Sequence, residues 1–311
     1  MAPQKIAIFG AGGMLGSKLV ELALAQTDAH ISAFVHSDLP KYPQTMSARL
    51  TGASLDIGNP EAVQAALVQV KPDLVINAAA MTNVDKCELY RSEALAANAL
   101  GPRQLAHVCT MLGAYLVHIS TDYIFSGTTL QPGPYNENAP ADPINWYGET
   151  KFRGENAIAE IGAGRIPWLI VRTALVYGHA SGGRSSFITW LIKELRAGRR
   201  VKIVNDQLNT PTFVDDLAAA LLQVIQRSMV GTLHLAGPEL IRRDLMALQV
   251  AHHYSLDPSL IDVIATAELR QIAPRPLYSG LNTKRTGELN GIPMRDLSAG
   301  LQALQLQLPM G

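Results

Sequence analysis

The chain has 311 residues, 48% of them hydrophobic, which is enough to bury a substantial core as one large domain or two closely packed ones. Its 26 basic and 26 acidic residues cancel, so the charge balance gives no reason to expect a nucleic acid or an anionic membrane as partner. No secretion-signal pattern precedes the first apolar run, no apolar stretch is long enough to cross a bilayer, and the two cysteines and eight histidines lack metal-ligand spacing. We therefore expect a cytoplasmic protein without a metal that binds a small molecule.

From the N-terminus to about Gly178, short apolar runs typical of buried strands alternate with stretches whose apolar residues recur at helical spacing. Parallel strands need crossover connections, which helices provide. The alternation therefore predicts a doubly wound α/β fold, with a parallel, Rossmann-type sheet covered on both faces. The expected strands are 5–9, 31–35, 74–77, 115–120 and 168–172, and the expected helices are 14–25, 60–70, 91–111 and 147–161.

Beyond Gly178 the pattern is less regular. A helix at 187–196 and a strand at 201–204 precede a helix at 214–226 and a strand at 232–235, which look like a return to the first domain. The prolines of the remaining tail favour a small irregular lobe over the carboxyl ends of the strands. We expect a dinucleotide-binding domain made of 1–178 and 212–237, and a smaller C-terminal substrate lobe made of 179–211 and 238–311.

Glycines recur every three residues, at Gly10, Gly13 and Gly16, between the first expected strand and helix. A pyrophosphate at such a turn meets backbone N–H groups and the positive end of the helix dipole, so the backbone from Gly10 through Met14 and Leu15 to Gly16 is a candidate dinucleotide site. Because Leu15 stands where the third glycine of G-x-G-x-x-G would fall, the longer spacing is the better match. A glycine-rich turn without a ligand is the alternative.

The segment after the second strand bears on which dinucleotide is bound. A carboxylate about 20 residues beyond the glycines would bind the ribose hydroxyls of NAD, and none is well placed. His36 and Ser37 follow the strand, with Asp38 slightly late and Lys41 beyond it. NADP(H) or NAD(H) is therefore expected, with a weak preference for NADP.

Tyr147 and Lys151 are separated by four residues, so they share one face of an expected helix. A free tyrosine titrates near 10, and a neighbouring ammonium favours its phenolate. The pair therefore suits proton transfer beside a nicotinamide. The alternative is a packing tyrosine followed by a solvated lysine.

These motifs together resemble the extended short-chain dehydrogenase/reductase family, and within it the dTDP-4-dehydrorhamnose reductases, over nearly the whole chain. The matching segments are Gly10 to Gly16, Val75 to Ala80 with Val84-Asp85-Lys86, Ser120 to Phe125, Tyr147 to Lys151, Arg172-Thr173, Val176-Tyr177-Gly178, Asp206-Gln207 with Pro211-Thr212, and Arg275-Pro276 before Ser279.

The resemblance implies reduction of the 4-keto group of a dTDP-4-keto-6-deoxy sugar by NAD(P)H, forming dTDP-L-rhamnose or a related deoxysugar. It assigns catalysis to Thr121, which would hydrogen-bond the substrate carbonyl, and to Tyr147, which would donate the proton. It assigns Lys151 to the cofactor ribose and to lowering the pKa of Tyr147. It also suggests a homodimer.

Further residues receive weaker assignments, each with a structural alternative. Cofactor contacts are expected at Ala78, Ala79 and Ala80, whose small side chains also suit tight packing, at Asn98, which could instead bond to backbone, and at Asp56 and Ile57, which also suit a surface turn. Substrate contacts are expected at Val84, Asp122 and Phe125, and at Arg275, which suits a pyrophosphate but also a surface ion pair.

Three positions depart from the pattern of these reductases. Ala174 and Leu175 follow Arg172-Thr173 where a tryptophan is often found, Asn209 stands where glycine is frequent, and Ser126 replaces a common acidic residue or proline. The departures keep two other functions open: a sugar-nucleotide epimerase or dehydratase of the same fold, and a non-catalytic NADP-binding regulatory subunit.

Overall fold

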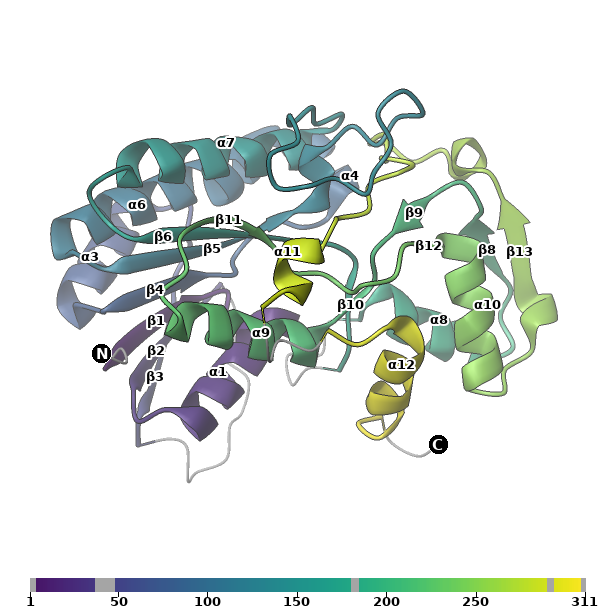
Figure 1. Cartoon of the computed structure of the whole chain (residues 1–311), viewed down its shortest axis with the longest axis horizontal. Helices are drawn as coiled ribbons and strands as arrows, with labels where there is room; N and C mark the ends of the chain where they lie inside the picture. Colours follow the sequence, from purple (N-terminus) through teal and green to yellow (C-terminus); the bar gives the residue numbers. More distant parts are fainter. Residues whose placement is uncertain (1–3, 37–47, 180–184, 290–293, 309–311) are drawn as a thin grey trace.

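Seven parallel strands form one sheet in the order β11-β6-β5-β4-β1-β2-β3 (Figure 1). The computed structural model describes residues 4–36, 48–179, 185–289 and 294–308. The sheet confirms the predicted Rossmann-type α/β fold. Its strands are β1 (Lys5–Phe9), β2 (His30–Val35), β3 (Leu50–Ser54), β4 (Leu74–Asn77), β5 (Tyr115–Thr121), β6 (Trp168–Thr173) and β11 (Gly231–His234).

Helices cover both faces of the sheet, as the alternating sequence pattern predicts (Figure 1). On one face α1 (Met14–Gln26) packs against α9 (Val214–Gln226), and their apolar residues join Ile6 and Ile8 of β1 in one core cluster. On the other face α3 (Pro60–Val70), α6 (Gly101–Leu112) and α7 (Trp146–Gly162) form a second cluster with Ala7 and Phe9. Successive β1 side chains thus enter opposite cores, which explains the continuous apolar run of this strand.

The strand order reverses between β1 and β4, which are neighbours in the sheet although β2 and β3 separate them in the chain. Ligands of open parallel sheets bind in the crevice outside the carboxyl ends of the strands at such a point. The glycine turn after β1 and residues 78–80 after β4 lie at this reversal. The topology therefore places the predicted cofactor segments side by side.

A second group of elements lies beside the sheet, at the right of Figure 1. Its helices α8 (Phe187–Arg196), α10 (Arg243–His253) and α12 (Leu297–Gln305) share an apolar cluster with the parallel pair β8 (Val201–Val204) and β13 (Ile261–Ile264). The prediction of an irregular tail is wrong here, because α10, β13 and α12 are regular elements. Their apolar residues pack against one another and against α8, whereas the proline spacing reflects only the loops between them.

Short elements complete the chain. They are α4 (Val84–Leu89), the 3-10 turns η2 (Asp122–Ile124), η3 (Pro258–Leu260) and η4 (Thr266–Leu269), β7 (Val176–Tyr177) paired with β10 (Thr212–Phe213), β9 (Leu208–Asn209) paired with β12 (Ile241–Arg242), and α11 (Lys284–Gly287).

The predicted helix 91–111 is interrupted. It consists of α5 (Arg91–Leu95), a π-helical turn η1 (Ala96–Leu100) and α6. Pro102 has no N–H to donate, so the regular hydrogen-bond ladder cannot continue through it. Strand β3 was not predicted because it is an edge strand whose LTGAS sequence is almost entirely exposed and lacks an apolar run.

Candidate active site

Thr121 and Tyr147 meet at the carboxyl edge of the sheet. Thr121 is the last residue of β5, and Tyr147 lies in the first turn of α7. Asn145 starts this helix, because its Oδ1 accepts a hydrogen bond from the Gly148 backbone N at 2.8 Å. A Cβ at Gly148 would lie 2.0 Å from the Tyr123 carbonyl oxygen, so this glycine lets the helix begin directly against the turn after Thr121. The local sequence therefore holds the two predicted catalytic hydroxyls together.

The Tyr147 hydroxyl favours its protonated form. Burial raises its pKa above the usual range, and the charges of Asp122 and Cys87 add to this, while a side-chain hydrogen bond with Thr121 acts in the opposite direction. The expected lowering by Lys151 does not appear, because the Lys151 amine is engaged elsewhere. A phenol that retains its proton is suited to act as a general acid.

Lys151 is almost fully buried, 2% exposed, one helical turn beyond Tyr147. Its Nζ donates to the Ile119 carbonyl oxygen at 2.6 Å and lies 3.2 Å from His118 Nε2. Burial lowers the pKa of Lys151 to about 8, and the charge of Glu155 opposes this shift. Sequence reasoning missed His118; the available signal was an imidazole inside the apolar run from Leu116 to Ile119 of β5.

The glycine turn makes backbone contacts that exclude a side chain at two of its positions. Gly10 has φ +76°, and a Cβ there would lie 2.6 Å from the Ala79 backbone N. At Gly16 a Cβ would lie 2.1 Å from the Gly10 carbonyl oxygen, whereas at Gly13 the nearest atom is 3.2 Å away. Gly10 and Gly16 are therefore required for the close approach of three backbone segments.

The same turn leaves donors for an anion. Helix α1 begins at Met14 with Gly13 as its cap, and no side chain caps the first N–H groups. These groups lack partners within the helix, so the N–H groups of Met14, Leu15 and Gly16 are available to a phosphate. The Leu15 side chain packs into the core, so only its backbone can contribute. The turn fits the pyrophosphate of a dinucleotide.

The other predicted cofactor residues lie around this turn. Ala78, Ala79 and Ala80 follow β4, and the Ala78 N donates to the Phe9 carbonyl oxygen at 3.0 Å, which ties this loop to the end of β1. All three alanines are partly exposed, so they keep their candidate role as cofactor contacts.

Asp56 and Ile57 follow β3 at the same edge of the sheet. Asp56 is exposed, and its Oδ1 accepts a hydrogen bond from the Gly58 N at 2.9 Å. This bond is typical of the surface turn that was the alternative to a cofactor contact at this residue. Ile57 is buried beneath Gly101. His36 is exposed at the end of β2, while Ser37, Asp38 and Lys41 lie outside the described residues.

Asn98 acts inside the protein. It is fully buried, its Oδ1 accepts from the Met81 N at 2.9 Å, and its Nδ2 donates to the Met81 carbonyl oxygen at 3.1 Å and to Thr150 Oγ1 at 3.2 Å. The predicted contact with the cofactor is therefore replaced by a supporting role. From the π-helical turn η1, Asn98 fastens the loop after β4 to helix α7.

Asp122 is also engaged within the protein rather than exposed to a ligand. Its Oδ1 accepts from Thr121 Oγ1 at 3.2 Å and its Oδ2 from Ser279 Oγ at 2.6 Å. Ser279 accepts in turn from Asn209 Nδ2 at 3.1 Å, so the asparagine that departs from the family pattern extends this network. Burial raises the pKa of Asp122 to about 6, against the effect of the Ser279 and Thr121 hydrogen bonds. Asp122 therefore positions Thr121 and joins it to the C-terminal segment.

Phe125 and Val84 differ in their access to a ligand. Phe125 is fully buried and stacks on Tyr135 with ring centroids 4.2 Å apart, so the prediction that it lines the substrate pocket is corrected to a packing role. Ala174, which stands where a tryptophan is frequent, belongs to the same buried cluster. Val84 is half-buried at the start of α4 and keeps its candidate role.

Two arginines approach the catalytic residues from the C-terminal half. Arg275 Nη2 pairs with Asp85 Oδ2 at 3.1 Å, and its Nη1 donates to the Ala273 carbonyl oxygen at 2.8 Å. Arg243 stacks over Phe187, 4.7 Å from guanidinium carbon to ring centroid. Within the described part of the chain no hydrogen bond or ion pair engages the Arg243 guanidinium, and its Nε is buried without a partner.

Burial and neighbouring charged groups shift the pKa of Arg243. Burial lowers the pKa of its guanidinium, the charges of Tyr123 and Asp122 oppose this, and Arg275 adds to the lowering. Sequence reasoning selected Arg275 and missed Arg243, because nothing in the sequence distinguishes an arginine with a carboxylate partner from one without.

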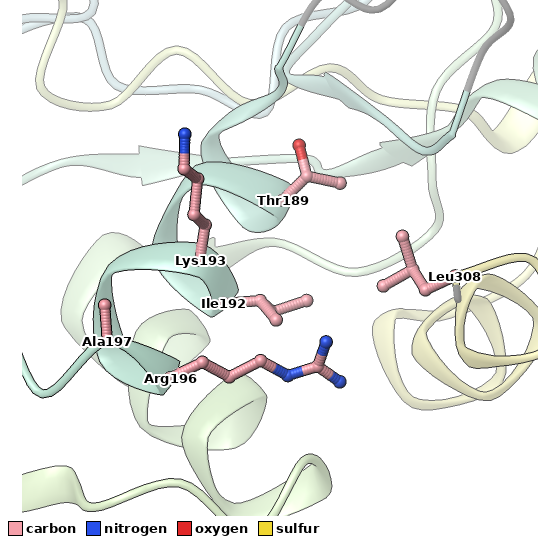
Figure 2. Close-up of a pocket in the computed structure, with 6 residues that line it drawn as sticks. All are labelled: Thr189, Ile192, Lys193, Arg196, Ala197 and Leu308. Atoms are coloured by element: carbon pink, nitrogen blue, oxygen red, sulfur yellow. The ribbon is translucent and has the colours of Figure 1, made fainter. Parts of the chain in front are cut away.

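The structure also has a surface hollow on α8 (Figure 2). Thr189, Ile192, Lys193, Arg196, Ala197 and Leu308 line it, and none of the residues predicted for catalysis or cofactor binding is among them. Among the described residues no group of three or more His, Cys, Asp or Glu side chains could hold a metal ion, and no helix is both long and apolar enough to span a membrane.

Known proteins match this chain over almost its full length. The family described as RmlD substrate binding domain matches residues 4–308. A dTDP-4-dehydrorhamnose reductase of Mycolicibacterium smegmatis is 34% identical over 301 residues, covering 96% of this chain and 84% of that protein. A probable dTDP-4,6-dihydroxy-2-methyloxan-3-one 4-ketoreductase of Streptomyces antibioticus is 34% identical over 298 residues, covering 95% and 92%.

Solved structures agree with these sequence matches. A dTDP-4-dehydrorhamnose reductase of Bacillus anthracis in complex with NADP superposes with a TM-score of 0.82 at 28% identity, covering 98% of this chain and 99% of that one. A dTDP-4-dehydrorhamnose reductase of Clostridium acetobutylicum gives a TM-score of 0.83 at 30% identity, covering 98% and 100%. These matches show that the chain belongs to the dTDP-4-dehydrorhamnose reductase family of the extended short-chain dehydrogenases/reductases.

Proposed function

We propose that this protein reduces the 4-keto group of a dTDP-4-keto-6-deoxy sugar with NAD(P)H, forming dTDP-L-rhamnose or a related deoxysugar. The observation that carries the proposal is the convergence of Thr121, Tyr147 and the buried Lys151 at the carboxyl edge of the sheet, beside the glycine turn. The names of the relatives supply the substrate class.

The roles of the residues follow from their chemistry. When bound, NAD(P)H supplies the hydride. When the substrate binds, the Thr121 hydroxyl turns its one hydrogen from Asp122 Oδ1 to the carbonyl oxygen. Tyr147 gives its proton to the same oxygen as negative charge develops there. Lys151 holds the ribose hydroxyls, and the backbone N–H groups from Met14 to Gly16 hold the pyrophosphate of the cofactor.

Arg243 is the candidate for the pyrophosphate of the sugar nucleotide. Among the described residues no carboxylate pairs with its guanidinium, whereas that of Arg275 is already paired with Asp85. Arg243 is partly buried, and its Nε is a buried donor without a partner in the described part of the chain, which is costly. A phosphate would satisfy this donor. Arg275 contributes positive charge from beside it.

Four further assignments belong to the same proposal. The dinucleotide-binding domain comprises 1–178 and 212–237 and the substrate lobe 179–211 and 238–311. The apolar cluster shared by α8, α10 and α12, to which Tyr177 and Phe213 also contribute, supports this division. Cytoplasmic location and a homodimer remain predictions from composition and from the family resemblance, as does the absence of a nucleic-acid partner.

A direct assay tests the function. Purified protein with NADPH and dTDP-4-keto-6-deoxymannose should oxidise one NADPH for each sugar reduced. An epimerase or dehydratase returns the hydride to its substrate, so turnover of the sugar without net loss of NADPH would overturn the reductase assignment. NADPH binding with no turnover on any keto-sugar nucleotide would instead favour a regulatory subunit.

A further inference from the structure

Lys151 ends a chain of buried polar groups that starts at Asn77. Asn77 Nδ2 lies 3.0 Å from His118 Nδ1, and His118 Nε2 lies 3.2 Å from Lys151 Nζ. Asn77 and His118 are fully buried and Lys151 is 2% exposed. Water therefore does not compete for these contacts, and each must have a donor on one side and an acceptor on the other.

The direction of the chain follows from its first member. Asn77 Oδ1 accepts a hydrogen bond from the Ala79 backbone N at 3.0 Å, which fixes the oxygen on that side of the amide. Its Nδ2 must then donate to His118 Nδ1, because an amide nitrogen has no lone pair to offer. A neutral His118 consequently carries its proton on Nε2, which faces Lys151.

An Nε2–H group requires an acceptor, and an ammonium has none. Lys151 can accept only as a neutral amine, which still donates one N–H to the Ile119 carbonyl oxygen. If Lys151 were instead an ammonium donating to Nε2, a neutral His118 would carry its proton on Nδ1, and the Asn77 amide would have to rotate to present its oxygen to that proton. The Asn77 Nδ2 and the Ala79 backbone N, which are both donors, would then face each other. The neutral amine is the state in which every contact of the chain is satisfied.

The charged and titratable groups around Lys151 permit this state. Tyr147 and Glu155 lie one turn before and after it on α7, and Glu155 is bonded to Arg172 of β6, with Arg172 Nη2 2.8 Å from Glu155 Oε2. Glu155 is thereby partly neutralised as a partner for an ammonium. Burial lowers the pKa of Lys151 to about 8, and burial, with the Lys151 charge, also lowers that of His118, which keeps the imidazole neutral.

We propose that at about pH 9 Asn77 and His118 hold Lys151 as a neutral amine in the cofactor-free enzyme, so that binding of the nicotinamide dinucleotide takes up one proton from solvent at Lys151. The negative pyrophosphate favours the ammonium. Protonation also turns the contact with His118 into a meeting of two donors, which releases Nζ towards the ligand. His118 is thus a positioning residue that acts through Lys151.

The first test uses the free, unaltered protein. Nitrogen-15 NMR of the histidine side chains, with His118 assigned by its absence in His118→Gln, should show Nε2 protonated and Nδ1 unprotonated around pH 9. An Nδ1-protonated His118 would overturn the proposal. This result does not depend on the assignment of Lys151 to the cofactor site, on which the proton uptake rests.

The second test measures the proton. Calorimetric titration with NADPH at about pH 9, in buffers of different ionisation enthalpy, should report uptake of roughly one proton, because an amine with a pKa of about 8 is then mostly neutral. Lys151→Met should abolish the uptake. Uptake near zero in the unaltered protein would refute the link between NADPH binding and protonation of Lys151. Failure to bind NADPH would instead refute the proposed function, and the NMR result would then decide the tautomer of His118.

A variant of Asn77 reverses the chain. In Asn77→Asp both carboxylate oxygens accept, so His118 should carry its proton on Nδ1 and offer Nε2 to an ammonium, and proton uptake should fall to less than half. Asn83→Asp is the matched control, since it makes the same change at the exposed N-cap of α4, after the loop that follows β4, and keeps the acceptor for the Lys86 N. Full uptake in a folded Asn77→Asp would contradict the proposal.

Discussion

Tyr147 shows how burial decides the chemistry of a single residue. The spacing to Lys151 suggested a phenol made acidic by a neighbouring charge, but burial is the largest influence and raises the pKa of this hydroxyl. For a reduction this is an advantage, because the general acid must hold its proton until negative charge develops on the substrate oxygen.

Removing the Tyr147 hydroxyl should therefore remove the proton source. We expect Tyr147→Phe to lower kcat by about 10²–10⁴-fold, the usual contribution of a general acid, with NADPH affinity changed much less. Steady-state kinetics and NADPH fluorescence titration measure the two quantities. Tyr90→Phe, at a half-exposed tyrosine outside the site, is the control; near-normal turnover of Tyr147→Phe would remove the assignment.

Asp122 should impose a pH dependence on stability. Its folded pKa of about 6 lies above its ordinary value of 3.8, so between these values the native state binds a proton that the unfolded state has lost. The contribution of Asp122 to the free energy of unfolding therefore falls as pH rises from about 4 to about 6. The difference between the folded and unfolded pKa values corresponds to about 3 kcal/mol in total.

Asp122→Asn cannot titrate and should lose this dependence. The difference in free energy of unfolding, variant minus unaltered protein, should therefore increase by about 2 kcal/mol between pH 4.5 and pH 7. The altered hydrogen bonds of the variant change its stability equally at both pH values and do not affect this increase. Urea unfolding at both pH values measures the difference. Asp142→Asn, at an exposed position, should leave the dependence unchanged, and parallel pH profiles for Asp122→Asn and the unaltered protein would contradict the assigned pKa.

At the scale of elements, a buried ion pair joins strand β6 to helix α7. Arg172 Nη2 and Nε lie 2.8 Å and 3.1 Å from the carboxylate oxygens of Glu155, and both side chains are almost fully buried. The guanidinium also donates to the Glu137 carbonyl oxygen at 3.0 Å and covers the ring of Phe125. The pair thus ties the catalytic helix to the sheet and to the loop before it.

Breaking one side of this pair should cost more than removing both. We expect Arg172→Met to lower the free energy of unfolding by about 3–5 kcal/mol, because it leaves the Glu155 charge buried without its partner. The double variant Arg172→Met/Glu155→Leu should recover a substantial part of that loss. Urea denaturation compares them with Arg153→Met, whose exposed pair with Glu149 should contribute less than about 1 kcal/mol; equal losses for Arg172→Met and Arg153→Met would contradict this account.

The elements also show which patterns predict structure. Strands β1 and β4 and helices α1 and α3 were predicted because their apolar periodicity is local and their caps and glycines stand beside them. The π-helical turn η1 and helix α4 were not, because a single proline or a six-residue helix produces no such period.

At the scale of the whole molecule, the proposed substrate site combines segments from distant parts of the chain. Strand β9 pairs with β12 on one side, and its Leu208 forms a β-bridge with Tyr278 on the other. Helix α10 begins with Arg243 directly after β12. Strand β9 thus links the start of α10 to the segment that follows Arg275. The hydrogen bond from Ser279 to Asp122 then connects that segment to the end of β5. Arg243 reaches the catalytic residues only through this assembly.

If Arg243 receives the pyrophosphate, its removal should weaken the binding of a nucleotide but not of a nucleoside. A hydrogen-bonded charge contributes about 1.5–3 kcal/mol, so Arg243→Gln should weaken dTDP binding by roughly 10–100-fold and leave thymidine binding within about twofold. Calorimetry measures both. Arg242→Gln is the matched control, because its exposed guanidinium is already paired with Asp244 at 2.7 Å, and equal dTDP affinity for the two variants would refute the role of Arg243.

The order of strands and helices, the glycine turn and the placement of Tyr147 and Lys151 on one helical face could all be predicted from the amino-acid sequence, because each is written in neighbouring residues. Which polar groups meet became apparent only in the folded chain. His118 faces Lys151, and Ser279 donates a hydrogen bond to Asp122. Asp85 forms an ion pair with Arg275, whereas Arg243 has no such partner among the described residues. Such pairs join residues that are far apart in the chain. Their contacts follow from how the elements pack, and packing leaves no period in the sequence.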